Sequence, residues 1–518
     1  MQPRLHYVTL VILLSVFLTF YVSFLLTLPV SPIPATPKTN LKEIIGYSLL
    51  KKIEIESERA SCAELIRPKK VRFQRSEMWT LVPGTNLHVF NVYYDDRLKP
   101  YRYLRLIGMM KGTTNQTLYC QTEMKDKIYH ITRAIIHEIW LKEWNEGDEQ
   151  TFNPVLISCS LPTGYIPQTL SINSDQCTLS SQTFNIIVPR VQETKDNYTT
   201  TVCVKSLNFV EDISVRLMQW IEMNRLLGAD RFHFFVGKIH KNVHELLRFY
   251  SRKLKDRFVV RRYRNVESVH GNEDDLAEQK RRSRHLGTLN NKNVSRMSSS
   301  VNNKRPLRDN DTFETVNYTE VFYREVWQKR RNEVITYNDC MYRNLRSSHF
   351  VIPLDIDEVI IPRVFYTWRT ALRHIFEDHP TLHERYASFS VRNAYFLEEY
   401  ARSASTNVFF FDYIKRSQFS DEGESGKSFV YVKNTLSVFN HYSLEALKPG
   451  IRRTFFLPED LLQKNHYKPT CLVALLPQCT KYTSSQIRIE DALINKYRTD
   501  FFKNYRDVYR MFTNKSDI

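Results

Sequence analysis

Glycine is scarce in this chain, with 13 glycines among 518 residues. Neither GxxxxGK nor GxGxxG occurs, although these are the glycine-rich loops by which P-loop and dinucleotide-binding enzymes hold phosphate groups. Their absence argues against a phosphoryl-transfer enzyme of the secretory lumen.

Closely spaced cysteine pairs are missing as well. The chain has eight cysteines but no CxxC, which argues against a zinc ribbon or a thioredoxin motif. An even number of cysteines permits disulfides in an oxidising compartment. Cys471 and Cys479 are close enough for a local loop closure, and the pairing of the others stays open at this point. The cysteines are Cys62, Cys120, Cys159, Cys177, Cys203, Cys340, Cys471 and Cys479.

Charge is absent between Tyr7 and Leu28. As a helix this stretch would be about 33 Å long, enough to cross a hydrocarbon core of about 30 Å. Arg4 precedes it, so the short N-terminal end should remain cytosolic. We predict a cytosolic tail (1–6), a transmembrane signal anchor (7–28) and a stem (29–75). The alternative is a cleaved signal peptide, but no clear small-x-small cleavage site follows.

Glycosylation sequons support a lumenal location for the rest of the chain. Six Asn-x-Ser/Thr sequons are spread along it, as expected for a glycoprotein. They begin at Asn115, Asn197, Asn293, Asn310, Asn317 and Asn514.

The chain is basic, with a formal net charge of +18, and much of the excess lies between Arg252 and Arg308. Such a run is most often a solvated segment. A lumenal protein meets little nucleic acid, so an acidic glycan or a membrane surface is the more plausible partner for it.

Apolar periodicity predicts the fold class. Short apolar runs between turns predict a β-rich N-terminal lobe over 76–190. From residue 201 to 261, strand, helix, strand, helix and strand alternate, with Gly228 as a helix C-cap. This order is typical of a parallel sheet in a doubly wound, Rossmann-type nucleotide-binding domain, which we place at 191–450.

Within and after this domain, four further features are expected. Residues 268–311 are poor in apolar side chains and predict a disordered insertion. A helix should run from Tyr318 to about Leu345, and further strands over 386–397 and 408–419. Residues 451–518 are expected to form a helical extension.

An Asp-x-Asp motif is the strongest candidate for chemistry. Asp355 and Asp357 end an apolar run that predicts a buried strand, so the two carboxylates should share one face. A divalent cation held there could bind a diphosphate. A second Asp-x-Asp at Asp309–Asp311 has no strand context, which shows that the bare pattern is weak. The alternative interpretation is a pair of carboxylates capping a turn.

Several blocks resemble glycosyltransferase family 92, also called DUF23. They are Met218-Gln219-Trp220-Ile221-Glu222 with Leu227-Gly228-Ala229-Asp230, then Arg331 to Arg343 with Asn338-Asp339-Cys340, then Leu354-Asp355-Ile356-Asp357-Glu358, and Lys433 to Leu444 with His441. Together they span about Thr201 to Pro449, roughly half of the chain. Gln219 stands where a Glu is more usual, and the 268–311 insertion is longer than expected.

The resemblance implies a type II Golgi membrane enzyme with a GT-A-like catalytic domain. It implies an inverting transfer of galactose from UDP-galactose to a glycan on a glycoprotein or glycolipid, with Mn²⁺ as the divalent ion. The rival hypothesis is a catalytically inactive, transferase-like membrane protein that binds a glycan.

Residue roles follow as hypotheses. Asp357 is expected to contact the metal, and Asp355 the donor ribose or a metal-bound water. His441 is either a further metal ligand or a hydrogen-bonded histidine at a strand end. Asn338 and Asp339 are either donor contacts or a buried polar pair. Arg331 and Arg343 either bind phosphate or are solvated.

Two questions stay open. Cys340 is expected to be a core or disulfide cysteine rather than a nucleophile. An inverting transfer needs a general base, and the sequence does not choose between the available acids. These are Glu358, Glu398, Glu399 and Asp412, of which Glu358 adjoins the motif but in a strand would face away from it.

Overall fold

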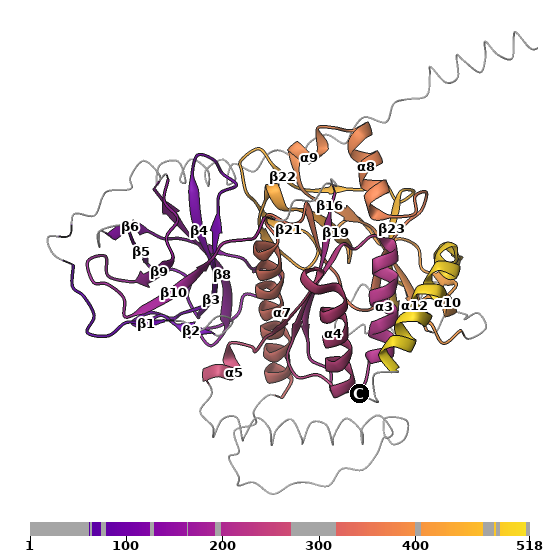
Figure 1. The fold of residues 1–518 in the computed structure, drawn as a ribbon, viewed down its shortest axis with the longest axis horizontal. Coiled ribbons are helices and arrows are strands. Elements are labelled where there is room, and N and C mark those ends of the chain that lie inside the picture. The colour runs from indigo at the N-terminus through magenta and orange to yellow at the C-terminus, as the bar shows by residue number, and fades with distance from the viewer. Residues whose placement is uncertain are drawn as a thin grey trace, which may run out of the picture. The chain divides into compact units, whose positions relative to one another are not determined.

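Two large sheets with one long helix between them organise the computed structural model of this chain (Figure 1). It describes residues 62, 65–73, 79–124, 129–162, 164–191, 198–270, 318–398, 406–469, 481–482 and 487–513. Several predicted features lie outside these residues: the tail and anchor, and most of the stem and of the insertion. The same holds for Cys471, Cys479, Glu399 and five of the six sequons. The sixth, Asn115, is exposed. Among the described helices, none is both long and apolar enough to span a bilayer.

A seven-stranded sheet forms the α/β part, and six of its strands run in the same direction. The strand–helix alternation predicts a parallel sheet, and this direction agrees with it. Strand β19 is the one strand of this described sheet that runs in the opposite direction, antiparallel to its neighbours β14 and β16. In order, the strands are β13 (Phe258–Arg262), β12 (Arg231–Val236), β11 (Thr200–Leu207), β14 (Phe350–Pro353), β19 (Lys427–Tyr431), β16 (Tyr386–Val391) and β22 (Arg452–Phe456).

Side-chain alternation along these strands builds a core on each face of the sheet. On β11, Val202 and Val204 face the core shared with helices α3 (Ser214–Leu227) and α4 (Lys241–Leu254). Cys203, between them, faces the opposite core. Gly228 ends α3 with φ of 116°, a left-handed conformation that favours glycine, so the predicted C-cap is confirmed.

Helix α7 (Tyr318–Arg343) covers that opposite face and lies between the two sheets (Figure 1). Its buried residues Val334, Tyr337 and Met341 share one core with Phe90 and Ile107 of the N-terminal sheet. A disulfide joins Cys340 to Cys203 of β11. This confirms that Cys340 is a disulfide cysteine, and it fixes α7 to the strand that it covers.

The β-rich lobe contains a ten-stranded sheet, as the N-terminal pattern predicts. Disulfides Cys62–Cys177 and Cys120–Cys159 cross-link it. Its central path is β6 (Tyr129–Arg133), β5 (Tyr119–Glu123), β9 (Thr169–Asn173), β10 (Gln182–Ile187), β3 (Leu87–Asp95), β4 (Arg102–Lys111), β8 (Phe152–Leu161) and β7 (Ile135–Glu138), with β1 (Arg72–Phe73) on β10 and β2 (Thr80–Leu81) on β3.

Smaller elements complete the described part. A three-stranded sheet has the order β15 (Glu358–Pro362), β23 (Leu462–Lys468), β17 (Asn393–Leu397). Two-stranded pairs are β18 (Lys415–Arg416) with β24 (Ile489–Glu490), and β20 (Thr435–Val438) with β21 (Ser443–Ala446). The other helices are α5 (Glu267–His270), α8 (Trp368–Asp378), α9 (Leu382–Arg385), α10 (Phe409–Asp412), α12 (Arg498–Thr513) and the 3-10 turns η2 (Lys255–Arg257), η3 (Val432–Asn434) and η4 (Leu493–Tyr497).

Two predictions about the C-terminal half need correction. The strand expected over 408–419 is instead the short helix α10 followed by β18. The helical extension at 451–518 contains strands as well: β22 closes the large sheet and β23 is central in the small one. Polar residues dominate β23, which is why its sequence does not look like a buried strand. The helical part of this extension is α12, which packs on α3.

Candidate active site

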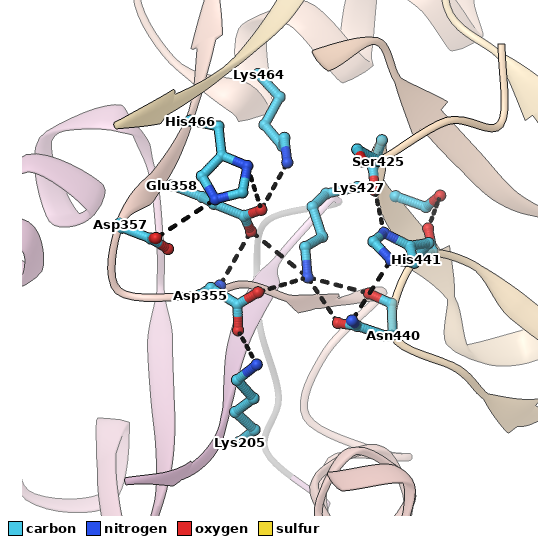
Figure 2. A network of polar contacts seen from close by, with 12 residues as sticks. Lys205, Asp355, Asp357, Glu358, Ser425, Lys427, Asn440, His441, Lys464 and His466 are labelled. Carbon is cyan, nitrogen blue, oxygen red and sulfur yellow. Dashed lines mark hydrogen bonds and ion pairs between the residues drawn. The ribbon is translucent and has the colours of Figure 1, made fainter. Parts of the chain in front are cut away.

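The Asp-x-Asp motif lies in a turn, not in a strand. β14 ends at Pro353 and β15 begins at Glu358, so the single strand predicted for this run is two strands in different sheets. The Glu358 amide donates to the Asp355 carbonyl at 3.0 Å, and the Asp355 amide donates to Glu358 Oε2 at 3.1 Å. The expectation that Asp355 and Asp357 share one face of a strand is therefore wrong, and each has different partners (Figure 2).

Two lysines hold the carboxylate of Asp355. Lys205 Nζ lies 3.1 Å from Oδ1, and Lys427 Nζ lies 3.2 Å from Oδ2. Burial opposes ionisation of Asp355, but the two ammonium groups outweigh it and hold its pKa well below the usual value. Burial likewise opposes the charge on Lys205, while Asp355 and Glu333 raise its pKa. Asp355 is therefore a fixed anion that faces cations.

Glu358 is buried in a second ion-pair group beside the first. Its Oε1 lies 2.6 Å from Lys464 Nζ, and its Oε2 lies 3.5 Å from Lys427 Nζ. Both lysines are fully buried. Burial raises the pKa of Glu358, but the charges of Lys427 and Lys464 together have the larger, opposite effect, and the pKa falls to about 2. A carboxylate that is paired with two lysines in this way has a structural role. This agrees with the expectation that Glu358, although it adjoins the motif, faces away from it.

Asp357 faces a histidine that the sequence did not single out. Its Oδ2 lies 3.4 Å from Nε2 of His466, and 30% of its side chain is exposed against 10% for His466. Strand β23 pairs His466 with Glu358, which brings the imidazole to the turn. Burial and the charge of Lys464 lower the pKa of His466, which favours the neutral, metal-binding form. Asp357 is thus the more accessible acid of the motif.

His441 lies at the other side of this group. Its Nδ1 donates to the Gly426 carbonyl at 2.6 Å, and its Nε2 lies 3.4 Å from the Asn440 amide nitrogen. Burial and Lys427 lower its pKa to about 3, so the ring is neutral. Donation from Nδ1 leaves Nε2 as the nitrogen with a lone pair, so both interpretations of His441 stay predictions, and His466 is the histidine that pairs with Asp357.

A cavity of about 870 Å³ opens beside these groups. Ligand pockets typically have volumes of about 300–1,000 Å³, so this one is large. One wall is the C-terminal end of β11 and the start of α3, which is where doubly wound sheets bind ligands. The turn at 355–358, the loop at 423–425 and the end of β23 form others. Arg216, Lys329, Arg330 and Lys468 also line it and give it cationic walls.

The predicted donor contacts on α7 do not line this cavity. Asp339 is fully buried and accepts hydrogen bonds from Tyr93 and Asn91 of β3 and, at 2.8 Å, from Arg343. Asn338 exchanges two hydrogen bonds with the backbone of Val438, both at 2.9 Å. These contacts join α7 to its neighbours, as the buried-polar-pair interpretation requires.

Arg331 is also placed away from the cavity. It is 1% exposed and binds Asn145 and Asn153 of the β-rich lobe. Neither the phosphate-binding nor the solvated interpretation describes it: the side chain is buried and holds two parts of the protein together.

Among the acids considered as general base, the geometry favours none outright. Glu398 is exposed and does not line the cavity. Asp412 accepts hydrogen bonds from the amide and hydroxyl of Thr406 at 2.7 and 2.8 Å. Glu424, which the sequence did not single out, does line the cavity, and it accepts a hydrogen bond from Tyr482 at 2.9 Å.

The site's donor set fits a divalent ion that shares its shell with a ligand. Within the described residues, no three His, Cys, Asp or Glu side chains are gathered as a complete metal cage. A metal that binds diphosphate needs only one or two carboxylates, because phosphate and water complete its shell. Asp357 with His466 supplies an oxygen and a nitrogen donor beside the cavity.

Comparison with known proteins gives two matches. The model of glycosyltransferase family 92 matches residues 198–291 and 307–505. These ranges contain the turn, all three lysines and both histidines, but not the β-rich lobe. A glycosyltransferase family 92 protein of Caenorhabditis elegans is 29% identical over 119 residues, which span 23% of this chain and 23% of that protein.

Proposed function

The chain belongs to glycosyltransferase family 92, and on this premise we propose that it is a metal-dependent glycosyltransferase with a GT-A-like catalytic domain. It moves galactose from UDP-galactose, with inversion, to a glycan acceptor on a glycoprotein or glycolipid. The observation that carries the proposal is the pairing of Asp357 with His466 at the edge of a cavity formed by the C-terminal end of β11.

Asp357 and His466 would hold Mn²⁺, which supplies positive charge to the departing diphosphate. Both carboxylate oxygens of Asp355 are ion-paired with lysines, so direct binding of the metal would require Asp355 to exchange a lysine for the ion. Asp355 is therefore better suited to orienting the donor ribose or a metal-bound water. Arg216 and Lys468 line the cavity and would add charge toward the phosphates. We place the general base at Glu424, since it lines the same cavity.

We also propose that the catalytic part is lumenal and anchored in the Golgi membrane by residues 7–28. The support is the charge-free run in the sequence and the oxidised state of the described cysteines. Three disulfides fit an oxidising compartment and not the cytosol.

A sugar-nucleotide screen on the full chain in detergent tests this function. UDP-galactose should be consumed with Mn²⁺ and spared after chelation with EDTA, while other UDP-sugars react more slowly. If no sugar nucleotide is consumed but one binds, the chain is an inactive glycan-binding relative. If another sugar is preferred, the donor assignment is wrong and the enzyme class stands.

A further inference from the structure

Three aromatic side chains line one part of the cavity. They are Trp144, Trp327 and Tyr442, all half-buried, and we call them the aromatic wall. They come from three different elements: the turn after β7, helix α7, and the turn between β20 and β21. Trp144 belongs to the β-rich lobe, which the family match does not include.

The aromatic wall is held in place by ring contacts. The ring of Trp144 lies 6.4 Å from that of Trp327 at 63°, and 5.0 Å from that of Phe439 at 72°. Phe439 in turn lies 6.1 Å from Tyr442. The two contacts of Trp144 are edge-to-face and that of Phe439 with Tyr442 is tilted at 32°, and aromatic contacts at these distances are favourable beyond simple burial. The cavity thus has a preformed aromatic surface.

A buried arginine fixes the turn that carries Trp144. Arg331 of α7 donates to the side chain and the carbonyl of Asn145, each at 2.8 Å. Its guanidinium carbon lies 4.4 Å from the centre of the Trp140 ring, and Trp140 also donates to the Asn145 carbonyl at 2.8 Å. Arg331 is therefore a positioning residue that sets the place of Trp144 in the cavity.

A short series of contacts connects the aromatic wall to the acidic turn. Lys427, which pairs with Asp355, donates to Asn440 Oδ1 at 2.7 Å. Asn440 adjoins His441, whose ring centre lies 6.2 Å from that of Trp144. The wall and the proposed metal pair thus border the same cavity within a short chain of contacts, while the donor nucleotide is expected at the C-terminal end of β11.

Resting on the function proposed above, we propose that the aromatic wall is the acceptor subsite and takes the pyranose ring of the acceptor sugar. A pyranose presents a face of C–H groups, which bury apolar area against an aromatic ring, and a rim of hydroxyls. Two polar residues close in sequence to the wall also line the cavity and can meet the hydroxyls: Arg330, three residues after Trp327 on α7, and Asn440, two residues before Tyr442. The β-rich lobe then takes part in acceptor selection through Trp144.

The first test compares transfer with donor hydrolysis in the full chain. For Trp144→Ala, hydrolysis of UDP-galactose without acceptor should stay near the wild-type value, and transfer to a panel of labelled oligosaccharides should fall about tenfold or more through the acceptor KM. Trp144→Phe should recover part of the loss. Tyr101→Ala is the control, because Tyr101 is 57% exposed on the same lobe and lies outside the cavity.

Other outcomes overturn the proposal in distinct ways. Equal loss of transfer and hydrolysis would mean that Trp144 stacks the donor's uracil or supports the fold. Unchanged transfer in Trp144→Ala and Tyr442→Ala would remove the aromatic wall from acceptor binding.

A binding measurement separates this inference from the proposed function. Wild type, with UDP and Mn²⁺ present, is applied to a printed array of neutral and sialylated oligosaccharides. Sugar binding that Trp144→Ala and Trp144→Phe weaken in that order supports the aromatic wall even if no donor is consumed. If the wild-type protein neither binds any sugar on the array nor transfers galactose to any acceptor, the proposal of an acceptor subsite is overturned. Arg331→Lys should weaken sugar binding in the same way, because it loosens the turn that carries Trp144. Its thermal unfolding midpoint is measured as well, and should show that the variant is folded at the temperature of the binding assay.

Discussion

The Nε2 atom of His466 lies 3.4 Å from Oδ2 of Asp357, and the two residues meet at one end of the antiparallel strand pair β15–β23. The Tyr467 amide, next to His466, donates to the Asp357 carbonyl at 2.8 Å and fixes the turn against β23. The ring of Tyr395 stacks 5.4 Å from that of His466 at 26°. The pair is therefore positioned by the fold before any ion binds.

Metal affinity should distinguish the two histidines beside the cavity. His466→Ala should weaken Mn²⁺ binding at least about tenfold, because it removes a donor next to Asp357. His441→Ala is the matched variant and should change it little, since its ring nitrogens neighbour Gly426 and Asn440. Titration followed by Mn²⁺ electron paramagnetic resonance, with UDP present, measures both. The reverse order would restore His441 as the ligand.

Removing Lys427 should destabilise the protein strongly. Lys427→Met leaves the buried Glu358 and the partly buried Asp355 with one cation fewer, and breaking a buried ion pair in this way costs about 3–5 kcal/mol. Lys481→Met is the control, because Lys481 and its partner Asp421 are 50% and 75% exposed. Urea unfolding without ligand measures the free energies. Equal midpoints for the two variants would contradict the ionic role assigned to Lys427.

The contribution of Asp95 to stability should depend on pH. It is 1% exposed and pairs with Arg97 at 2.8 Å and Arg105 at 3.3 Å. Burial opposes its ionisation, but the two arginines hold its pKa below the ordinary value. A lowered pKa stabilises the folded state above the unfolded-state pKa, and the effect is lost as pH falls.

Asp95→Asn should therefore lower the free energy of unfolding most near pH 7, and the deficit should shrink toward about pH 3. Asp96→Asn is the neighbouring control, since its pair with Arg346 is 29% and 28% exposed and should contribute about 0–1 kcal/mol. Urea unfolding at both pH values measures this. A deficit that does not change with pH would show that packing, not charge, is what Asp95 supplies.

Glu424 should be required for transfer. Glu424→Gln keeps the shape and the hydrogen bond from Tyr482 but cannot accept a proton, so the transfer rate should fall about 10²–10⁴-fold. Glu422→Gln, two residues away, exposed and outside the cavity, should keep the wild-type rate. Single-turnover transfer with donor saturating isolates the step. A Glu424→Gln variant with normal transfer would move the base to another acid.

The parallel part of the fold could be predicted from the sequence because its periodicities are local. Strand β12 (Arg231–Val236) lies within the strand–helix alternation predicted over 201–261, and Gly228 ends α3 where the pattern requires. Each signal depends on residues within one element, where apolar spacing reports the period directly.

The sequence located the acidic site at Asp355 and Asp357, but it did not predict which residues surround them. The run around Asp355 is apolar on both sides, so nothing local shows that it divides between two sheets. Lys464 and His466 lie in a strand with polar residues on both faces, and they are buried because β23 pairs with β15 and brings them to Glu358. Such residues become recognisable only when tertiary pairing supplies their counter-charges.

The Asn338-Asp339-Cys340 block shows the opposite case. These motif residues serve the architecture: Asp339 binds β3, Asn338 binds Val438, and Cys340 closes a disulfide to β11. A recognisable motif is thus consistent with packing between sheets as well as with ligand contact, and only the position of the cavity separates the two.

Mn²⁺-dependent consumption of UDP-galactose by wild type and by Asp357→Asn tests the central claim most directly. The account predicts that wild type depends on added Mn²⁺ and that Asp357→Asn loses at least about a hundredfold in rate at every Mn²⁺ concentration, while remaining folded. Turnover by Asp357→Asn at the wild-type rate, with the same dependence on Mn²⁺, would contradict it.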